Sequence, residues 1–184
     1  MTRQEAYKLI TNWTQNRNLV KHMLAVEEEM RAIAKYLGED EEKFGLAGLV
    51  HDADYEKWPK EHPRKTLEEL KKQKAPEWLY NAVKRHAWKF NGMDEAPETK
   101  LEWALYTCDE LSGFIIACTL VRPDKKLGSL TVESILKKWP QKTFAAGVHR
   151  PQIELCEEKL GIKLKDYIQI CLKALQGISK DLGL

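Results

Sequence analysis

Apolar residues recur along most of the chain at intervals of three to four positions, as they do on one face of an α-helix. β-branched residues never alternate with polar ones over a useful length, so strands are not expected. Thr2 and Glu5 have the form of a capping box, and Gly38 is suited to end a helix. Helices are predicted at about 2–14, 40–50, 76–88, 97–121 and 163–181, and from Asn16 or Asn18 to Gly38. Further helices are predicted to start at Thr66, Thr131 and Pro151, and a short one is predicted around Pro140.

Two interruptions stand out between these helices. The stretch from Ala53 to Lys65 holds two prolines and many charges and is predicted to be a loop, and Asn91-Gly92 marks a turn. A chain of 184 residues is long enough for one full hydrophobic core. We therefore expect an all-α fold, an irregular helical bundle that forms a single domain over residues 1–184. Its core is expected at about 16–123, with C-terminal helices at about 131–182.

Charge and composition narrow the possible partners. The chain has 30 basic and 28 acidic residues, which gives a net charge of +2. Proteins that bind nucleic acid through its phosphates carry a clear basic excess, so a helical nucleic-acid-associated protein is disfavoured. No apolar run approaches the length of a membrane span, and the four cysteines form no C-x-x-C pair. We expect a cytoplasmic protein with neither a membrane nor nucleic acid as a partner.

Histidines and acidic residues form one ordered series along the chain. Histidine is the commonest metal-ligating side chain, and carboxylates complete such sites. Four of the five histidines fall in this series, which favours a metal-dependent hydrolase. Only His149 lies outside it. The members are His22, the adjacent pair His51-Asp52, His62, His86 and Asp109.

The helical pattern places three members of this series inward. Asp109 lies in an otherwise apolar helix, and a buried carboxylate without a partner costs several kcal/mol. It therefore needs a metal ion, or a lysine or arginine in a structural salt bridge. His22 and His86 also lie on apolar faces, where a single histidine is more often a hydrogen-bonded core residue. Taken together, the three inward polar residues favour a shared site.

The His51-Asp52 pair directly follows a predicted helix end, where the backbone can turn both side chains toward one centre. A carboxylate there can bridge two metal ions while the histidine binds one of them. The alternative is a capping aspartate beside a surface histidine, and the dipeptide alone does not decide between the two.

The series resembles the H…HD…D motif of the HD superfamily of metal-dependent phosphohydrolases, from the second helix to about Leu120. The segment 51–62, Arg122-Pro123 and the segment 144–148 are similar to a bacterial branch of HDIG-domain proteins, although Ala53-Asp54 replaces Ile-Gly. The Gly-Tyr-Pro element of the cyclic-di-GMP phosphodiesterases is absent. The resemblance implies one metal ion bound by His22, His51, Asp52 and Asp109. It also implies a second ion, bridged by Asp52 and held by His62 and His86. His86 is the favoured ligand, because its inward position follows from the helical pattern, whereas His62 lies in a charged loop and is either a ligand or an exposed side chain.

The function implied is hydrolysis of a phosphate monoester or diester of a small phosphorylated molecule, with a nucleotide as the expected substrate. One or two divalent transition-metal ions (Mn, Fe, Co, Ni or Zn) would activate the attacking water. Asp54 either moves a proton or orients the water, or else only caps the turn. The candidate phosphate-binding residues are Lys57, Lys60, Arg64, Lys89 and Arg122. Lys57 and Arg122 are favoured, because one follows the His51-Asp52 loop and the other ends the helix that contains Asp109. Aromatic residues near the motif either stack on a base or pack on the core: Tyr55, Trp58, Trp88 and Phe90. A metal-containing module that binds or senses a nucleotide without turnover is the alternative.

Overall fold

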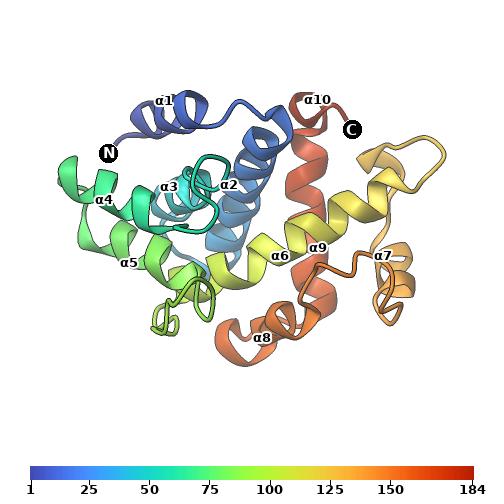
Figure 1. Ribbon diagram of the computed structural model, residues 1–184. Coiled ribbons are helices and arrows are strands. Elements are labelled where there is room, and N and C mark those ends of the chain that lie inside the picture. The colour runs from blue at the N-terminus through green and yellow to red at the C-terminus, as the bar shows by residue number, and fades with distance from the viewer.

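The computed structural model describes residues 1–184 and contains ten α-helices, one short 3-10 helix and no β-strand. The all-α prediction is therefore confirmed. Figure 1 shows α4 and α5 at one end of the molecule and α7 at the other, with α6 running between them. The helices are α1 (Arg3–Trp13), α2 (Arg17–Leu37), α3 (Glu41–Val50), α4 (Arg64–Lys72), α5 (Glu77–His86), α6 (Lys100–Leu120), η1 (Leu127–Ser129), α7 (Val132–Lys138), α8 (Arg150–Leu160), α9 (Leu164–Gly177) and α10 (Ser179–Leu182).

The predicted helix around Pro140 is wrong, because residues 142–147 form successive turns. Ala145 there has a positive φ of 45°, a conformation that a right-handed helix does not contain. The predicted final helix is instead two helices, α9 and α10, which are separated at Ile178. The 3-10 helix η1 was not expected. These differences all lie in the C-terminal third of the chain.

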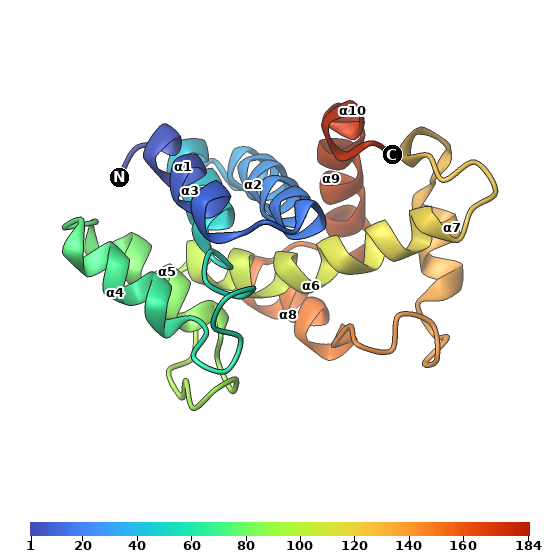
Figure 2. The ribbon, with the colours of Figure 1, turned by 45° about the horizontal axis from the view of Figure 1, so that its top comes forward.

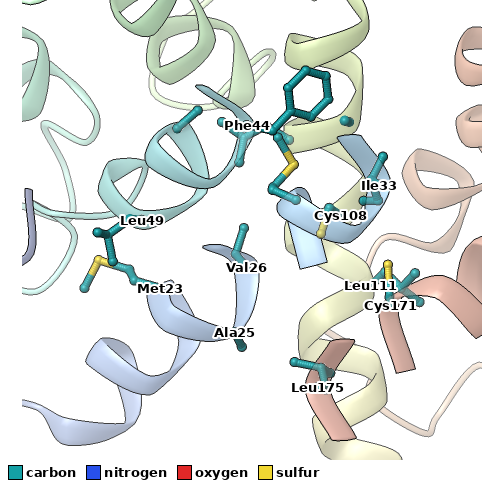
Figure 3. Close-up of a cluster of buried hydrophobic side chains, with 14 of the residues drawn as sticks. Met23, Ala25, Val26, Ile33, Phe44, Leu49, Cys108, Leu111, Cys171 and Leu175 are labelled. Carbon is teal, nitrogen blue, oxygen red and sulfur yellow. The ribbon is translucent and has the colours of Figure 1, made fainter. Parts of the chain in front are cut away.

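Helix α6 crosses the middle of the molecule, with α1, α2 and α3 on one side and α8 on the other (Figure 2). A continuous cluster of 41 buried residues joins these helices, from Ala6 on α1 to Leu182 on α10. Figure 3 shows Leu111 of α6 beside Cys171 of α9 at the centre of this core. All four cysteines are buried and free.

Helices α2 and α3 pack unusually closely because of one glycine. A Cβ atom added at Gly48 on α3 would lie 2.8 Å from the carbonyl oxygen of Val26 on α2. The side chain of Met23 lies beside that of Leu49 across the same contact (Figure 3). The close approach brings the end of α3, and the His51-Asp52 pair that follows it, against the middle of α2.

The loop between α3 and α4 is fastened to the start of α2. The Glu56 carboxylate accepts hydrogen bonds of 2.9 Å from the backbone N–H groups of Gln15 and Asn16. The rings of Trp13 and Trp58 meet edge to face, with their centroids 5.1 Å apart. The loop that begins with His51-Asp52 is therefore held against the end of α1 and the start of α2.

A buried ion pair sets the start of α6 against the end of α5. Thr99 and Glu102 form a capping box, as the first turn of a long helix favours. Glu102 Oε2 also lies 3.0 Å from Nη1 of Arg85, the residue before His86. Helix α6 is thus fixed relative to α5.

None of the helices is long and apolar enough to cross a membrane.

Candidate metal centre

Six side chains from five separate segments meet in the interior, between α2, α3, α5 and α6. The sequence series predicted these six residues, and the fold brings all of them together. They are His22 on α2, His51 at the end of α3, Asp52 directly after it, His62 in the loop before α4, His86 at the last position of α5, and Asp109 in the middle of α6.

The first set of donor atoms surrounds one point. Asp109 Oδ1 lies 2.9 Å from His22 Nε2 and 3.4 Å from His51 Nε2. Asp52 Oδ2 lies 3.6 Å from His51 Nε2 and 3.9 Å from His22 Nε2. Ligand atoms that share a metal ion with bonds of about 2.1 Å are roughly 3–3.5 Å apart. The four side chains therefore have a spacing close to that of a single metal site.

The second set uses the other oxygen of Asp52. Oδ1 lies 3.3 Å from His62 Nε2 and 3.7 Å from His86 Nε2. The two Nε2 atoms are themselves only 3.1 Å apart. Asp52 thus offers one carboxylate oxygen to each set, which is the arrangement of a carboxylate that bridges two ions.

The protons on two of the imidazoles follow from their partners. His51 Nδ1 lies 2.7 Å from the carbonyl oxygen of Gly48, and His86 Nδ1 contacts the carbonyl oxygen of Val83. A carbonyl oxygen only accepts, so both Nδ1 atoms carry a hydrogen, and in the neutral ring each Nε2 keeps a lone pair that can bind a metal ion. His51 Nε2 is buried and has no hydrogen-bond partner. A cation in the centre would satisfy that atom, so these residues fit a metal ion.

Asp54 lies behind His62 rather than at the cavity. Its Oδ1 is 2.7 Å from His62 Nδ1, while Oδ2 accepts hydrogen bonds from the backbone N–H groups of Lys65 and Thr66. The residue is fully buried. The geometry therefore favours the capping interpretation over direct proton transfer to a substrate. Asp54 also holds the His62 ring with Nε2 turned toward Asp52.

The two carboxylates of the centre, those of Asp52 and Asp109, favour a positive charge beside them. Burial alone lowers the pKa of His51, but the charges of Asp52 and Asp109 raise it to about 9. Burial opposes ionisation of both carboxyls. The charge of His51 nevertheless holds the pKa of Asp52 below its usual value and that of Asp109 well below it. A proton on His51 thus balances the carboxylates where a metal ion would otherwise do so.

The centre opens into a cavity of about 580 Å³. Five of the six residues line it, and the fully buried His51 lies behind them. Aromatic side chains form much of the wall, and residues beyond α6 complete it. The other lining residues are Leu19, Tyr55, Ala87, Trp88, Lys89, Phe90, Tyr106, Glu110, Gly113, Val148, His149 and Gln152.

The structure does not bring the two expected phosphate-binding residues to this cavity. Lys57 faces α1, where its Nζ donates to the carbonyl oxygen of Asn12 at 3.3 Å. Arg122 donates through Nε to Ser129 Oγ at 2.9 Å. It lies 13 positions after Asp109, which is about 20 Å along a helix. Neither side chain lines the cavity, and both contact other parts of the protein.

Lys89 and His149 both line the cavity. Lys89 was one of the five basic candidates from the sequence but not one of the two that were favoured, and His149 was not a candidate. Lys89 had one usable signal, because it lies three residues after His86 and just before the predicted Asn91-Gly92 turn. His149 had none, because it is isolated in a turn-rich segment and reaches the cavity only through the packing of α8 against α6.

Comparison with protein families matches residues 19–113 to the HD domain, which is more than half of the chain and includes all six residues of the centre. Proteins with this domain are generally metal-dependent hydrolases of the phosphohydrolase superfamily. A search of curated proteins finds no significant match. Together with the all-α fold and the H…HD…D arrangement, the match shows that the chain belongs to the HD domain family.

Proposed function

We propose that this protein is a metal-dependent phosphohydrolase that cleaves a phosphate monoester or diester of a small molecule, with a nucleotide as its substrate. The observation that carries the proposal is the position of Asp52. Its two oxygens serve separate donor sets, 3.6 Å from His51 Nε2 and 3.3 Å from His62 Nε2, beside a cavity large enough for a small ligand.

The six residues would hold one or two divalent ions of Mn, Fe, Co, Ni or Zn, which would neutralise charge on the phosphate and lower the pKa of the attacking water. The chain itself supplies orientation. The hydrogen bonds from Nδ1 of His51 and His86 fix both rings, so that neither donor atom has to reorganise when a ligand binds. Asp54 does the same for His62.

The exposed aromatic side chains of the cavity support a nucleotide as the substrate class. Tyr55 is 39% exposed and Phe90 is 46% exposed, and both line the cavity. Their ring centroids lie 5.3 Å and 6.1 Å from that of His62. Stacking of a base on an aromatic ring contributes about 1–3 kcal/mol. Either ring is therefore placed to hold a base while the phosphate meets the centre.

A panel of nucleotide monoesters and diesters, assayed with added Mn²⁺, tests the proposal. The variant Asp52→Ala is expected to remain folded and to lose metal-dependent turnover. Asp94→Ala, at an exposed position away from the cavity, is the matched control and should keep wild-type turnover. Full activity in Asp52→Ala would overturn the assignment. Nucleotide binding without turnover of any substrate would instead indicate the sensing module.

A further inference from the structure

Lys89 lies in a tight turn that the backbone holds in a sparsely populated conformation. Its φ is 68°, and Asn91 in the same turn has a φ of 47°. Non-glycine residues rarely adopt this left-handed region, and such strain concentrates at ligand-binding sites. The Lys89 N–H donates to the carbonyl oxygen of Met93 at 2.7 Å, which closes the turn. The position of Lys89 is thus determined by the surrounding structure.

The turn is attached directly to the second donor set. It begins immediately after His86, and Asn91 Nδ2 donates to the carbonyl oxygen of His62 at 2.8 Å. Arg64 Nη2 in turn donates to the carbonyl oxygen of Asn91 at 2.9 Å. The backbone of Lys89 is therefore held in position relative to both His62 and His86.

The ammonium group of Lys89 is available to a ligand. It lies 4.1 Å from the centre of the Trp88 ring, and both residues line the cavity. Lys84 on α5 pairs with Glu95, whereas Lys89 takes part in no ion pair with a carboxylate. Among the residues that line the cavity, Lys89 is the one lysine or arginine.

We propose that Lys89 binds the phosphoryl oxygens of the substrate, in place of the Lys57 and Arg122 expected from the sequence. The proposal rests on the proposed phosphohydrolase function for the identity of the anion. A phosphoryl group at the centre carries oxygens that the ions do not contact, and an ammonium on the cavity wall can donate hydrogen bonds to them. The indole face of Trp88 holds the ammonium at the wall without neutralising it.

Binding of inorganic phosphate to the Mn²⁺-loaded full chain, measured by titration calorimetry, tests this assignment. Lys89→Asn is the informative variant, because asparagine tolerates the left-handed conformation and removes the charge. Lys74→Asn is the matched control: Lys74 is also exposed, has a φ of 52° and lies away from the cavity. We expect the dissociation constant for phosphate to rise about tenfold or more in Lys89→Asn and to stay unchanged in Lys74→Asn.

Equal phosphate affinity in the two variants would overturn the role of Lys89, as would a wild-type protein that binds no phosphate. Hydrolysis assays on the same variants separate this outcome from a failure of the proposed function. Turnover that is equally efficient in both variants would retain the phosphohydrolase and reject Lys89. Phosphate binding that depends on Lys89 in a protein without turnover would reject hydrolysis and retain Lys89.

Discussion

His62 and His86 face each other through their Nε2 atoms at 3.1 Å, although each ring already uses Nδ1 in another hydrogen bond. Two lone pairs directed at one another repel, and a shared cation removes the repulsion. With Asp52 Oδ1 only 3.3 Å from His62 Nε2, the pair forms a three-donor site. Because the other oxygen of Asp52 belongs to the first donor set, this one carboxylate connects the two sets.

Replacing Asp54 by asparagine is expected to weaken metal binding without removing a ligand. One carboxylate oxygen serves His62 Nδ1 and the other serves the N–H groups of Lys65 and Thr66, so an amide must leave one partner unsatisfied. Loss of such an orienting partner typically lowers metal affinity about 10–100-fold. Competition of the variant with a metal-binding dye measures the effect, and Asp94→Asn serves as the control. Unchanged affinity would show that Asp54 only caps α4.

Gly48→Ala is expected to destabilise the protein by about 1–3 kcal/mol, because the new methyl group would overpack the contact between α2 and α3. The added Cβ would lie 2.8 Å from Val26 O. Chemical denaturation measures the free energy of unfolding. Gly177→Ala is the matched helical control, since its Cβ meets no atom within 4 Å. It should leave stability unchanged or raise it by up to about 1 kcal/mol. Equal stability of the two variants would refute the close-packing explanation.

Glu29→Gln is expected to stabilise the protein increasingly as the pH rises. Burial holds the pKa of the Glu29 carboxyl well above its usual value of about 4.5, so the folded chain keeps a proton that the unfolded chain releases. Stability from this group is complete below about pH 4.5 and is lost as the pH rises toward the raised folded pKa. Glutamine does not titrate and avoids the loss.

The difference in melting temperature between Glu29→Gln and the wild type, followed from about pH 4 to about pH 8, measures this effect. The difference should grow in favour of the variant with rising pH. Glu77→Gln, at an exposed position, should show no such trend. A difference that stays constant or shrinks would mean that Glu29 is ionised in the folded protein.

Phe90→Ala is expected to raise KM for nucleotides about tenfold, because the exposed ring at the cavity is placed to stack on a base. Glycerol phosphate, which has no aromatic ring, should keep its KM in this variant. Tyr36→Ala removes an aromatic side chain that is 58% exposed away from the cavity and serves as the control. An equal loss for both kinds of substrate would argue against base recognition by Phe90.

The sequence predicted the residues of the centre because helical periodicity determines which side chains point inward. His22 and Asp109 lie on apolar faces of long helices, and the fold brings their side chains within 2.9 Å. The pairing of Asp52 with both donor sets followed only from the family resemblance, since a dipeptide at a helix end has no fixed orientation. The structure adds that the two carboxylate oxygens of Asp52 are directed to different donor sets.

The phosphate-binding candidates could not be placed from the sequence for a related reason. Lysines and arginines in loops follow no periodicity, so their direction depends on tertiary contacts. Lys57 turns to the carbonyl oxygen of Asn12 on α1, and Lys89 reaches the cavity only because its turn is bonded to His62 through Asn91. His149 likewise comes from a segment whose helix around Pro140 was wrongly predicted.

The number of metal ions bound per chain tests the bridging role of Asp52 most directly. Metal-free protein is dialysed against Mn²⁺ and analysed for metal content, with His86→Ala and His149→Ala alongside. The geometry predicts two ions in the wild type, one in His86→Ala, and two in His149→Ala, whose histidine belongs to neither donor set. A single ion in the wild type, retained in His86→Ala, would contradict a centre in which Asp52 joins two metal sites.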